Sequence, residues 1–210
     1  MQCAHCLRGC AQALDIELKH IDALMERVDS IGNLTFTGGE PSLNVQAIEY
    51  ALKSAKSNCV EVSSFYIATN GISIETDFIV ACLQWYAYCE EKEICQVQVS
   101  NDYWHACEES YNTELLDGLS FFGRKSSEEG DQYLSGLINE GNSLENGLGA
   151  REMEDYGFDV QDDYIEEGEL YLNAHGDIVS GCNWSYESQE EYKVCRVDEL
   201  TTKSLWNYEV

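Results

Sequence analysis

Three cysteines lie within the first ten residues of the chain, at Cys3, Cys6 and Cys10. Thiolates are the ligands of iron–sulfur clusters and of many zinc ions, and two cysteines separated by two residues commonly share one metal. This segment is therefore a candidate metal centre. No second cysteine pair lies nearby, so a zinc ion would need His5 or Cys10 as a further ligand. Thiols without a metal at a frayed N-terminus are the remaining interpretation.

Three polar loops each follow a segment that we predict to be a strand. Strands are predicted over residues 33–37, 60–69 and 94–100, and helices over 14–30, 45–58 and 75–90. Ser42 or Asn44 is a suitable cap for the helix over 45–58. Alternation of strands and helices with these connection lengths predicts an α/β fold with a parallel sheet and helices outside it.

The carboxyl ends of parallel strands share one edge of a sheet, and ligands of α/β proteins bind at that edge. The polar loops at residues 38–41, 70–71 and 101–105 all follow predicted strands. We therefore expect the three loops to lie at one edge and to form the candidate ligand site.

The second half of the chain has a weaker pattern. Short helices are predicted at 114–122 and 132–140, and a β-hairpin is predicted over 168–184 around His175, Gly176 and Asp177. Residues 126–170 contain fourteen acids and one base. We place a domain boundary after residue 125, with an α/β core over 1–125 and an acidic, loop-rich extension with a β-hairpin over 126–210, packed on the core.

The chain has 39 acidic and 12 basic side chains, which gives a formal net charge of −27. This charge argues against direct binding to nucleic acid or to an anionic membrane surface. No apolar run is long enough to span a membrane and no secretory signal is visible, so we expect a cytoplasmic protein. In a reducing compartment most of the ten cysteines should be free. We expect Cys59, Cys82, Cys89 and Cys95 to be small core residues.

Four motifs together point to a family. "CAHC" at 3–6, "TFTGGEPSL" at 35–43, "ATNG" at 68–71 and "VQVSNDYWH" at 97–105 occur in an order and spacing that resemble the radical S-adenosylmethionine (SAM) superfamily. The resemblance implies a partial (β/α) barrel. It also implies a 4Fe-4S cluster on three cysteines in a C-x3-C-x2-C loop, with S-adenosylmethionine on the open iron. Such an enzyme generates a 5′-deoxyadenosyl radical.

The resemblance also assigns roles to residues. Cys3 and Cys6 match the second and third cluster ligands, and the GGEP loop matches the segment that contacts the methionine amino group. Residues after the next two strands match positions that meet the ribose or the substrate. The implied cofactor-binding residues are Gly38, Gly39, Glu40, Pro41, Asn70, Ser100 and Asn101. The resemblance assigns no catalytic side chain.

One feature departs from the family pattern. The first cluster ligand would lie four residues before Cys3, ahead of Met1, and the first barrel strand would also lie there. The chain start is then a shortened product, or Cys10 replaces the lost ligand in a C-x2-C-x3-C order, which Gly9 would have to accommodate. We therefore expect impaired or degenerate radical chemistry. Further candidates, each with a structural alternative, are His105 as an acid or base, Cys182 and Cys195 as auxiliary cluster ligands, and Arg151 as a carboxylate partner.

A second hypothesis uses the charge alone. An acidic surface can imitate the phosphates of DNA and occupy the basic groove of a nucleic-acid-binding protein, as phage-encoded inhibitors of restriction or CRISPR systems do. In this hypothesis the partner is a basic protein and the chain has no enzymatic activity. An unpaired edge strand would also favour pairing with another chain, which includes a second copy.

Overall fold

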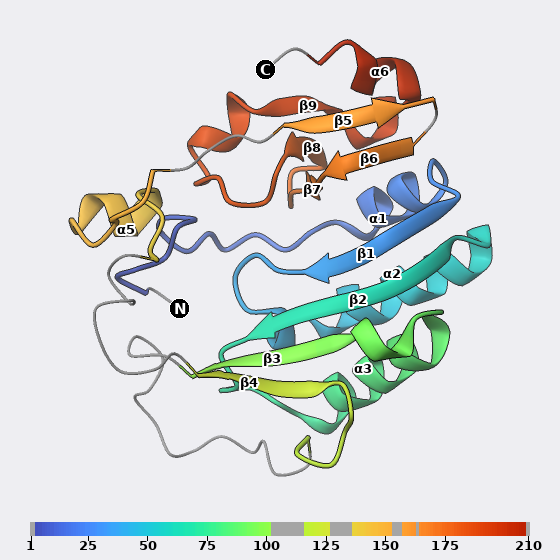
Figure 1. Cartoon of the computed structure of the whole chain (residues 1–210), viewed down its shortest axis with the longest axis horizontal. Helices are drawn as coiled ribbons and strands as arrows, with labels where there is room; N and C mark the ends of the chain where they lie inside the picture. Colours follow the sequence, from blue (N-terminus) through green and yellow to red (C-terminus); the bar gives the residue numbers. More distant parts are fainter. Residues whose placement is uncertain (1–2, 102–115, 127–135, 153–156, 163, 209–210) are drawn as a thin grey trace. The chain divides into compact units, whose positions relative to one another are not determined.

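The computed structural model describes residues 3–101, 116–126, 136–152, 157–162 and 164–208 (Figure 1). The chain forms two compact units. The first, which we call the sheet unit, is Val28–Glu129. The second, the hairpin unit, combines Met1–Arg27 with Gly130–Val210.

The sheet unit contains a four-stranded parallel sheet. Its strands follow the order β1-β2-β3-β4, and each pairs with the next one along the chain (Figure 1). Their bounds are β1 Ser30–Phe36, β2 Glu61–Thr69, β3 Gln96–Asn101 and β4 Phe122–Ser126. The predicted parallel α/β sheet is therefore confirmed. Among the described residues the sheet is open, and the partial barrel stays a prediction.

Two helices connect the first three strands, α2 (Val45–Asn58) and α3 (Thr76–Tyr88). The predicted bounds of α2 are confirmed, and Asn44 is its cap, because the Asn44 side chain accepts a hydrogen bond from Ala47 N at 3.2 Å. The short 3-10 helices η1 (Pro41–Leu43) and η2 (Lys92–Ile94) precede α2 and β3.

The helices α2 and α3 cover one face of this sheet (Figure 1). Buried apolar side chains from the strands face them, among which Phe65, Ile67 and Val97 have no solvent exposure. Trp85 of α3 is fully buried, lies edge-on to Phe36 with ring centroids 5.5 Å apart, and donates a hydrogen bond to Ile48 O at 3.0 Å. Burial of these large side chains holds the sheet and its helices together.

Several predicted elements differ from the structure. The helix predicted over 14–30 is the shorter α1 (Leu18–Met25). The apolar residues Leu14, Ile16 and Leu18 recur every second residue, which is as compatible with extended chain as with a helix. Cys82, Cys89 and Cys95 are buried as predicted, but Cys59 is exposed, because it ends α2 in a left-handed conformation with φ 57°.

The helix predicted over 114–122 is wrong in its described part. Residues 116–118 form a turn, and Phe122 begins β4, opposite Val97 of β3. Pairing with β3 satisfies the backbone hydrogen bonds of this segment, and this gain outweighs its local helical propensity. Of the helix predicted over 132–140, residues 136–140 are described and are not helical. The short helix α5 (Gly141–Glu145) follows instead.

The hairpin unit contains two small antiparallel sheets. The predicted hairpin is confirmed, since β7 (Leu170–Leu172) pairs with β8 (Asp177–Ser180), and β8 pairs in turn with β9 (Lys193–Arg196). A separate two-stranded ribbon joins β5 (Phe158–Gln161) to β6 (Tyr164–Gly168). The remaining short elements are η3 (Ser188–Glu190), η4 (Val197–Glu199) and α6 (Thr202–Trp206).

The N-terminal 27 residues belong to the hairpin unit. A small core forms where Ala23 and Leu24 of α1 pack on Ile178, Val197 and Leu200. The predicted boundary after residue 125 lies near the break between units at 129/130, but residues 1–27 cluster with 130–210 and not with the sheet. In the described part of the chain, no helix is long and apolar enough to cross a membrane.

His20 of α1 is 5% exposed and lies against Gly176 in the β7–β8 turn. A Cβ at Gly176 would come within 2.4 Å of the imidazole ring. Burial lowers the pKa of His20 below its usual 6.5, and Lys19 and Arg196 add to the effect, while Glu17 and Asp198 oppose it. Folding therefore favours the neutral imidazole.

This burial predicts a pH-dependent stability. In the unfolded chain His20 has a pKa near 6.5, whereas in the folded chain its pKa is lower. The free energy of unfolding should therefore fall as the pH drops below about 6.5, until the lower folded pKa is reached. Urea denaturation at pH 7.5 and 5.5 measures this loss. His20→Gln should show a smaller loss, and an equal loss in both proteins would contradict the prediction.

Candidate functional site

The strand registers place the predicted loops at one edge of the sheet. Phe36 of β1 lies opposite Ile67 of β2, and Thr69 of β2 lies opposite Val99 of β3. The GGEP loop and Asn70 therefore follow the ends of β1 and β2, and Ser100 lies near the end of the neighbouring parallel strand β3 (Figure 1). We call this region the carboxyl edge. The sequence prediction that these loops converge is confirmed for the described loops at 38–41 and 70–71.

Glu40 connects the first two loops of the carboxyl edge. Its Oε1 accepts hydrogen bonds from Thr69 Oγ1 at 2.6 Å, from Ser42 Oγ at 2.8 Å and from Ser42 N at 3.1 Å. Its Oε2 accepts a hydrogen bond from Asn70 N at 2.8 Å. The carboxylate is 9% exposed, so these contacts are only weakly screened by water. Glu40 thus caps η1 and also ties the end of β1 to the end of β2.

The glycines before Glu40 leave room at the carboxyl edge. Gly38 has φ 117°, a conformation that side-chain-bearing residues rarely adopt. Gly39 has no heavy atom within 4 Å of the position where a Cβ would stand. A ligand could therefore approach the backbone of Gly39 closely, which is the role that the resemblance assigns to this loop.

The other predicted cofactor-binding residues differ in how they lie. Pro41 is buried at the start of η1, so its ring supports the loop. The Asn70 side chain accepts a hydrogen bond from Ile72 N at 2.9 Å, and this contact turns the chain after β2. Ser100 is half-buried near the end of β3, and Asn101 is its last residue. No described contact joins Ser100 to Glu40.

Sequence reasoning missed the polar face of the sheet. Opposite the helices, Asn33 Nδ2 donates to Ser64 Oγ at 2.7 Å, and Tyr66 OH donates to Gln98 Oε1 at 3.0 Å. Burial raises the pKa of Tyr66 further above neutral pH, so the phenol remains a hydrogen-bond donor. The signal was present in the sequence, because polar residues recur every second position within the strands.

The three N-terminal cysteines lie in a loop that packs on α5. Asn142 organises it: its N–H donates to Cys6 O at 2.9 Å, its Nδ2 donates to Cys3 O at 2.9 Å, and its Oδ1 accepts the Cys10 thiol at 3.7 Å. A Cβ at Gly141 would come within 2.4 Å of Gly9 N, so only glycine permits this approach. The interpretation of residues 3–10 as a frayed terminus is therefore wrong.

Arg8 anchors the same loop. Its side chain is 5% exposed, its Nη1 donates to Trp184 O at 2.8 Å, and its guanidinium lies 4.4 Å from the centre of the Tyr171 ring. The backbone of Tyr186 adds a hydrogen bond to Arg8 O at 3.0 Å. The cysteine loop is thus held by residues more than 130 positions away in the sequence.

The folded loop gives the three cysteines different surroundings. Cys3 and Cys6 are half-buried, whereas Cys10 is exposed and its thiol is directed to Asn142. Within the described ranges no three His, Cys, Asp or Glu side chains gather as a metal site requires. The cluster on Cys3, Cys6 and Cys10 stays a prediction.

The remaining candidates have separate surroundings where the structure describes them. Burial, together with a hydrogen bond to Glu169, raises the pKa of the Cys182 thiol to about 12. Cys182 contacts Asn183, whereas Cys195 contacts Ser204, so their thiols have different neighbours. Arg151 is exposed. His105 lies outside the described residues.

No protein-family model matches the chain, and no curated protein matches its sequence. The resemblance to the radical S-adenosylmethionine superfamily therefore rests on the four motifs.

The role of Asn142 predicts the reactivity of the cysteine loop. Asn142→Ala removes the side-chain contacts to Cys3 O and Cys10, so the loop should open more often and its thiols should react several-fold faster with iodoacetamide. Peptide mass spectrometry after timed labelling measures each cysteine. Cys82, buried in α3, is the internal control and should keep its slow rate. Unchanged labelling at Cys3, Cys6 and Cys10 would contradict the role given to Asn142.

Proposed function

We propose that the chain is a radical-SAM-like protein that binds S-adenosylmethionine at the carboxyl edge of β1–β3, with impaired or degenerate radical chemistry. The observation that supports this proposal best is the arrangement of Glu40, which joins the GGEP loop to Thr69 and Asn70 through two hydrogen bonds and accepts two more from Ser42 of its own loop. All three residues belong to motifs that carry the resemblance, and they lie together although Glu40 is 29 positions from Thr69 and 30 from Asn70.

The proposal gives the residues of this edge defined tasks. Glu40 Oε2 accepts one hydrogen bond, so it retains an acceptor position for the amino group of the methionine moiety. The open space at Gly39 admits that moiety against the backbone. Ser100 and Asn101, at the end of β3, would meet the ribose or the substrate.

The cluster is a separate part of the proposal. In the superfamily a bound 4Fe-4S cluster supplies the electron that cleaves S-adenosylmethionine. Cys3, Cys6 and Cys10 would be the ligands of such a cluster, and no step of the proposed binding passes through it. We propose that S-adenosylmethionine binding persists and that radical formation is weak or lost.

A cavity-filling substitution tests the binding site. Gly39→Val places a side chain in the open space at the carboxyl edge without a forbidden backbone angle, so the protein should fold and bind S-adenosylmethionine at least tenfold more weakly. Gly32→Val is the matched control, because Gly32 of β1 also has nothing within 4 Å and lies before the polar loop. Isothermal titration calorimetry measures the affinities, and thermal melting confirms folding. Equal binding by the wild type and both variants, or no binding by the wild type, would contradict the proposed site.

Anaerobic reconstitution with iron and sulfide tests the second part of the proposal. A protein that binds S-adenosylmethionine but retains little iron and sulfide would support a degenerate enzyme. Four irons per chain together with reductive cleavage of S-adenosylmethionine would overturn the proposed impairment and support a competent enzyme.

One observation favours the acidic-protein hypothesis as a second candidate function. The β5–β6 ribbon exposes Asp159, Asp162, Glu166 and Glu167, within a chain of net charge −27. Carboxylates spread along an exposed ribbon can face a basic groove. In this hypothesis the ribbon blocks a basic nucleic-acid-binding protein.

The salt dependence of partner capture tests this candidate. Charge contacts on a surface are screened over roughly 10 Å at 0.1 M salt and roughly 3 Å at 1 M salt. Basic proteins captured on the immobilised chain at 0.1 M salt should therefore be released at 1 M salt. The triple variant Asp159→Asn, Glu166→Gln, Glu167→Gln should retain fewer of them. Capture that is insensitive both to salt and to this variant would count against the hypothesis.

A further inference from the structure

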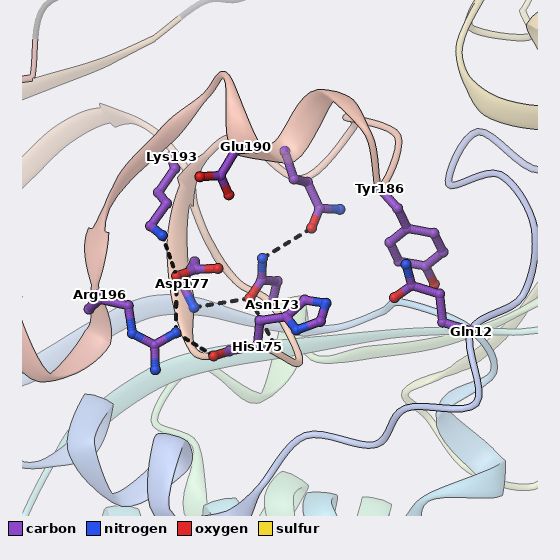
Figure 2. Close-up of a pocket in the computed structure, with 9 residues that line it drawn as sticks. Gln12, Asn173, His175, Asp177, Tyr186, Glu190, Lys193 and Arg196 are labelled. Atoms are coloured by element: carbon purple, nitrogen blue, oxygen red, sulfur yellow. Dashed lines mark hydrogen bonds and ion pairs between the residues drawn. The ribbon is translucent and has the colours of Figure 1, made fainter.

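The hairpin unit contains a cavity of about 330 Å³ that the proposed function does not use. It is separate in sequence from the carboxyl edge, since every residue that lines it belongs to the hairpin unit. Its volume is at the lower end of the range for small-molecule sites, so a ligand of few heavy atoms fits it. The lining side chains are all polar or charged: Gln12, Asn173, His175, Asp177, Tyr186, Gln189, Glu190, Lys193 and Arg196 (Figure 2).

The base of this cavity is held rigidly. Asn173 Oδ1 accepts hydrogen bonds from the backbone N–H groups of His175 at 3.0 Å and Asp177 at 2.9 Å. Asn173 Nδ2 donates to Gln189 Oε1 at 3.2 Å. Asn173 and Gln189 are 6% and 4% exposed, so the turn between β7 and β8 is fixed before any ligand arrives. Such preorganisation reduces the entropy lost on binding.

One side of the cavity carries an excess of positive charge. Asp177 Oδ1 lies 2.9 Å from Lys193 Nζ and 3.1 Å from Arg196 Nη1 (Figure 2). Burial raises the pKa of Asp177, but hydrogen bonds from Lys193 and Arg196 outweigh it, so the pKa lies below its usual value. Within the lining, two cations thus share one ionised carboxylate. Outside the lining, the exposed Asp198 offsets part of this charge, because its Oδ1 lies 3.8 Å from Arg196 Nε. Lys193 and Arg196 keep N–H groups that can bind a further carboxylate.

A second acid faces the same cavity. Glu190 lines it and is exposed. The hydrogen bond that Lys193 donates to Asp177 is the main cause that raises the pKa of Lys193, and the charge of Glu190 contributes less. Among the described residues no ion pair joins Glu190 to Lys193. The cavity therefore presents an unpaired carboxylate and partly neutralised cations at once. Tyr186 and Gln12 lie on the side away from Lys193 and Arg196 and offer uncharged hydrogen-bonding groups (Figure 2).

These charges select the chemistry of the ligand. A phosphate or another multiply charged anion would be repelled by Glu190 and by the negative field of a chain with net charge −27. A simple cation would be repelled by Lys193 and Arg196. A zwitterion has no net charge, and its two ends match the two kinds of group.

We propose that this cavity binds a free α-amino acid, with the ligand carboxylate on Lys193 and Arg196 and its ammonium group on Glu190. The Tyr186 and Gln12 side would contact the ligand side chain, and its hydrogen-bonding groups favour a short polar one. The proposal is independent of S-adenosylmethionine binding at the carboxyl edge.

Titration calorimetry with L-amino acids and blocked analogues tests the proposal. At least one amino acid of a panel that includes L-serine and L-glutamine should bind. Its N-acetyl derivative, which lacks the ammonium group, and its amide, which lacks the carboxylate, should each bind at least tenfold more weakly. Absence of binding by the whole panel at millimolar concentration would overturn the proposal. Equal or tighter binding by inorganic phosphate or by the N-acetyl derivative would overturn it in favour of a simple anion site.

Two neighbouring glutamates provide a matched pair of variants. Glu190→Gln should weaken amino-acid binding at least tenfold, and it should abolish the preference over the N-acetyl derivative. Glu187→Gln makes the same change on an exposed neighbour outside the cavity and should bind as the wild type does. Both positions are exposed, so both variants should fold, which thermal melting checks. Equal affinities in the two variants would overturn the role of Glu190.

S-adenosylmethionine also ends in an α-amino acid group, so the two proposed sites are separated by exchanging variants and ligands. Glu190→Gln should leave S-adenosylmethionine binding unchanged, and Gly39→Val should leave amino-acid binding unchanged. Loss of S-adenosylmethionine binding in Glu190→Gln would show that this cavity holds that molecule, and would overturn the assignment to a free amino acid. Failure of S-adenosylmethionine to bind anywhere leaves the amino-acid measurement intact.

Discussion

The carboxyl edge of the parallel sheet depends on one buried carboxylate. Glu40 receives hydrogen bonds from its own loop, through Ser42, and from the end of the neighbouring strand, through Thr69 and Asn70. Hydrogen bonds to a charged group contribute roughly 1.5–3 kcal/mol each, and a buried donor left without its acceptor costs about 1–3 kcal/mol. The carboxylate therefore sets the distance between the two loops that any ligand at this edge would contact, and Gly38 and Gly39 leave the approach open.

The hairpin unit is organised by a different constraint, the close approach of two backbones. Gly141 and Gly9 lie so near one another that a side chain at Gly141 would collide with the cysteine loop. Asn142 then satisfies the loop carbonyls, and the buried Arg8 attaches the loop to the hairpin. The conformation of the three cysteines is thus decided by residues of the acidic half of the chain. The positions of the thiols, and therefore what they can bind, depend on contacts with that half.

The charged side chains are distributed unevenly in the molecule. The 39 acids greatly outnumber the 12 bases, so the bases cannot neutralise most of the carboxylates. Two of the twelve bases are nevertheless drawn to Asp177, where burial strengthens the attraction. This concentration of cations in an acidic chain gives the cavity of the hairpin unit both signs of charge. The rest of the acidic surface suits solubility or a basic partner, which are properties of total charge and not of fold.

The sequence by itself determined the alternation of strands and helices, the bounds of α2 with its Asn44 cap, the parallel sheet and the convergence of the GGEP loop with Asn70. These features follow from local periodicity, capping and strand direction, which neighbouring residues encode. Only the tertiary structure decided that residues 1–27 join residues 130–210 and that a turn and the first residue of β4 stand in the described part of a predicted helix. It also decided that Asp177, Glu190, Lys193 and Arg196 line one cavity. Contacts between distant segments depend on which surfaces pack together on folding, and local sequence patterns do not encode that pairing.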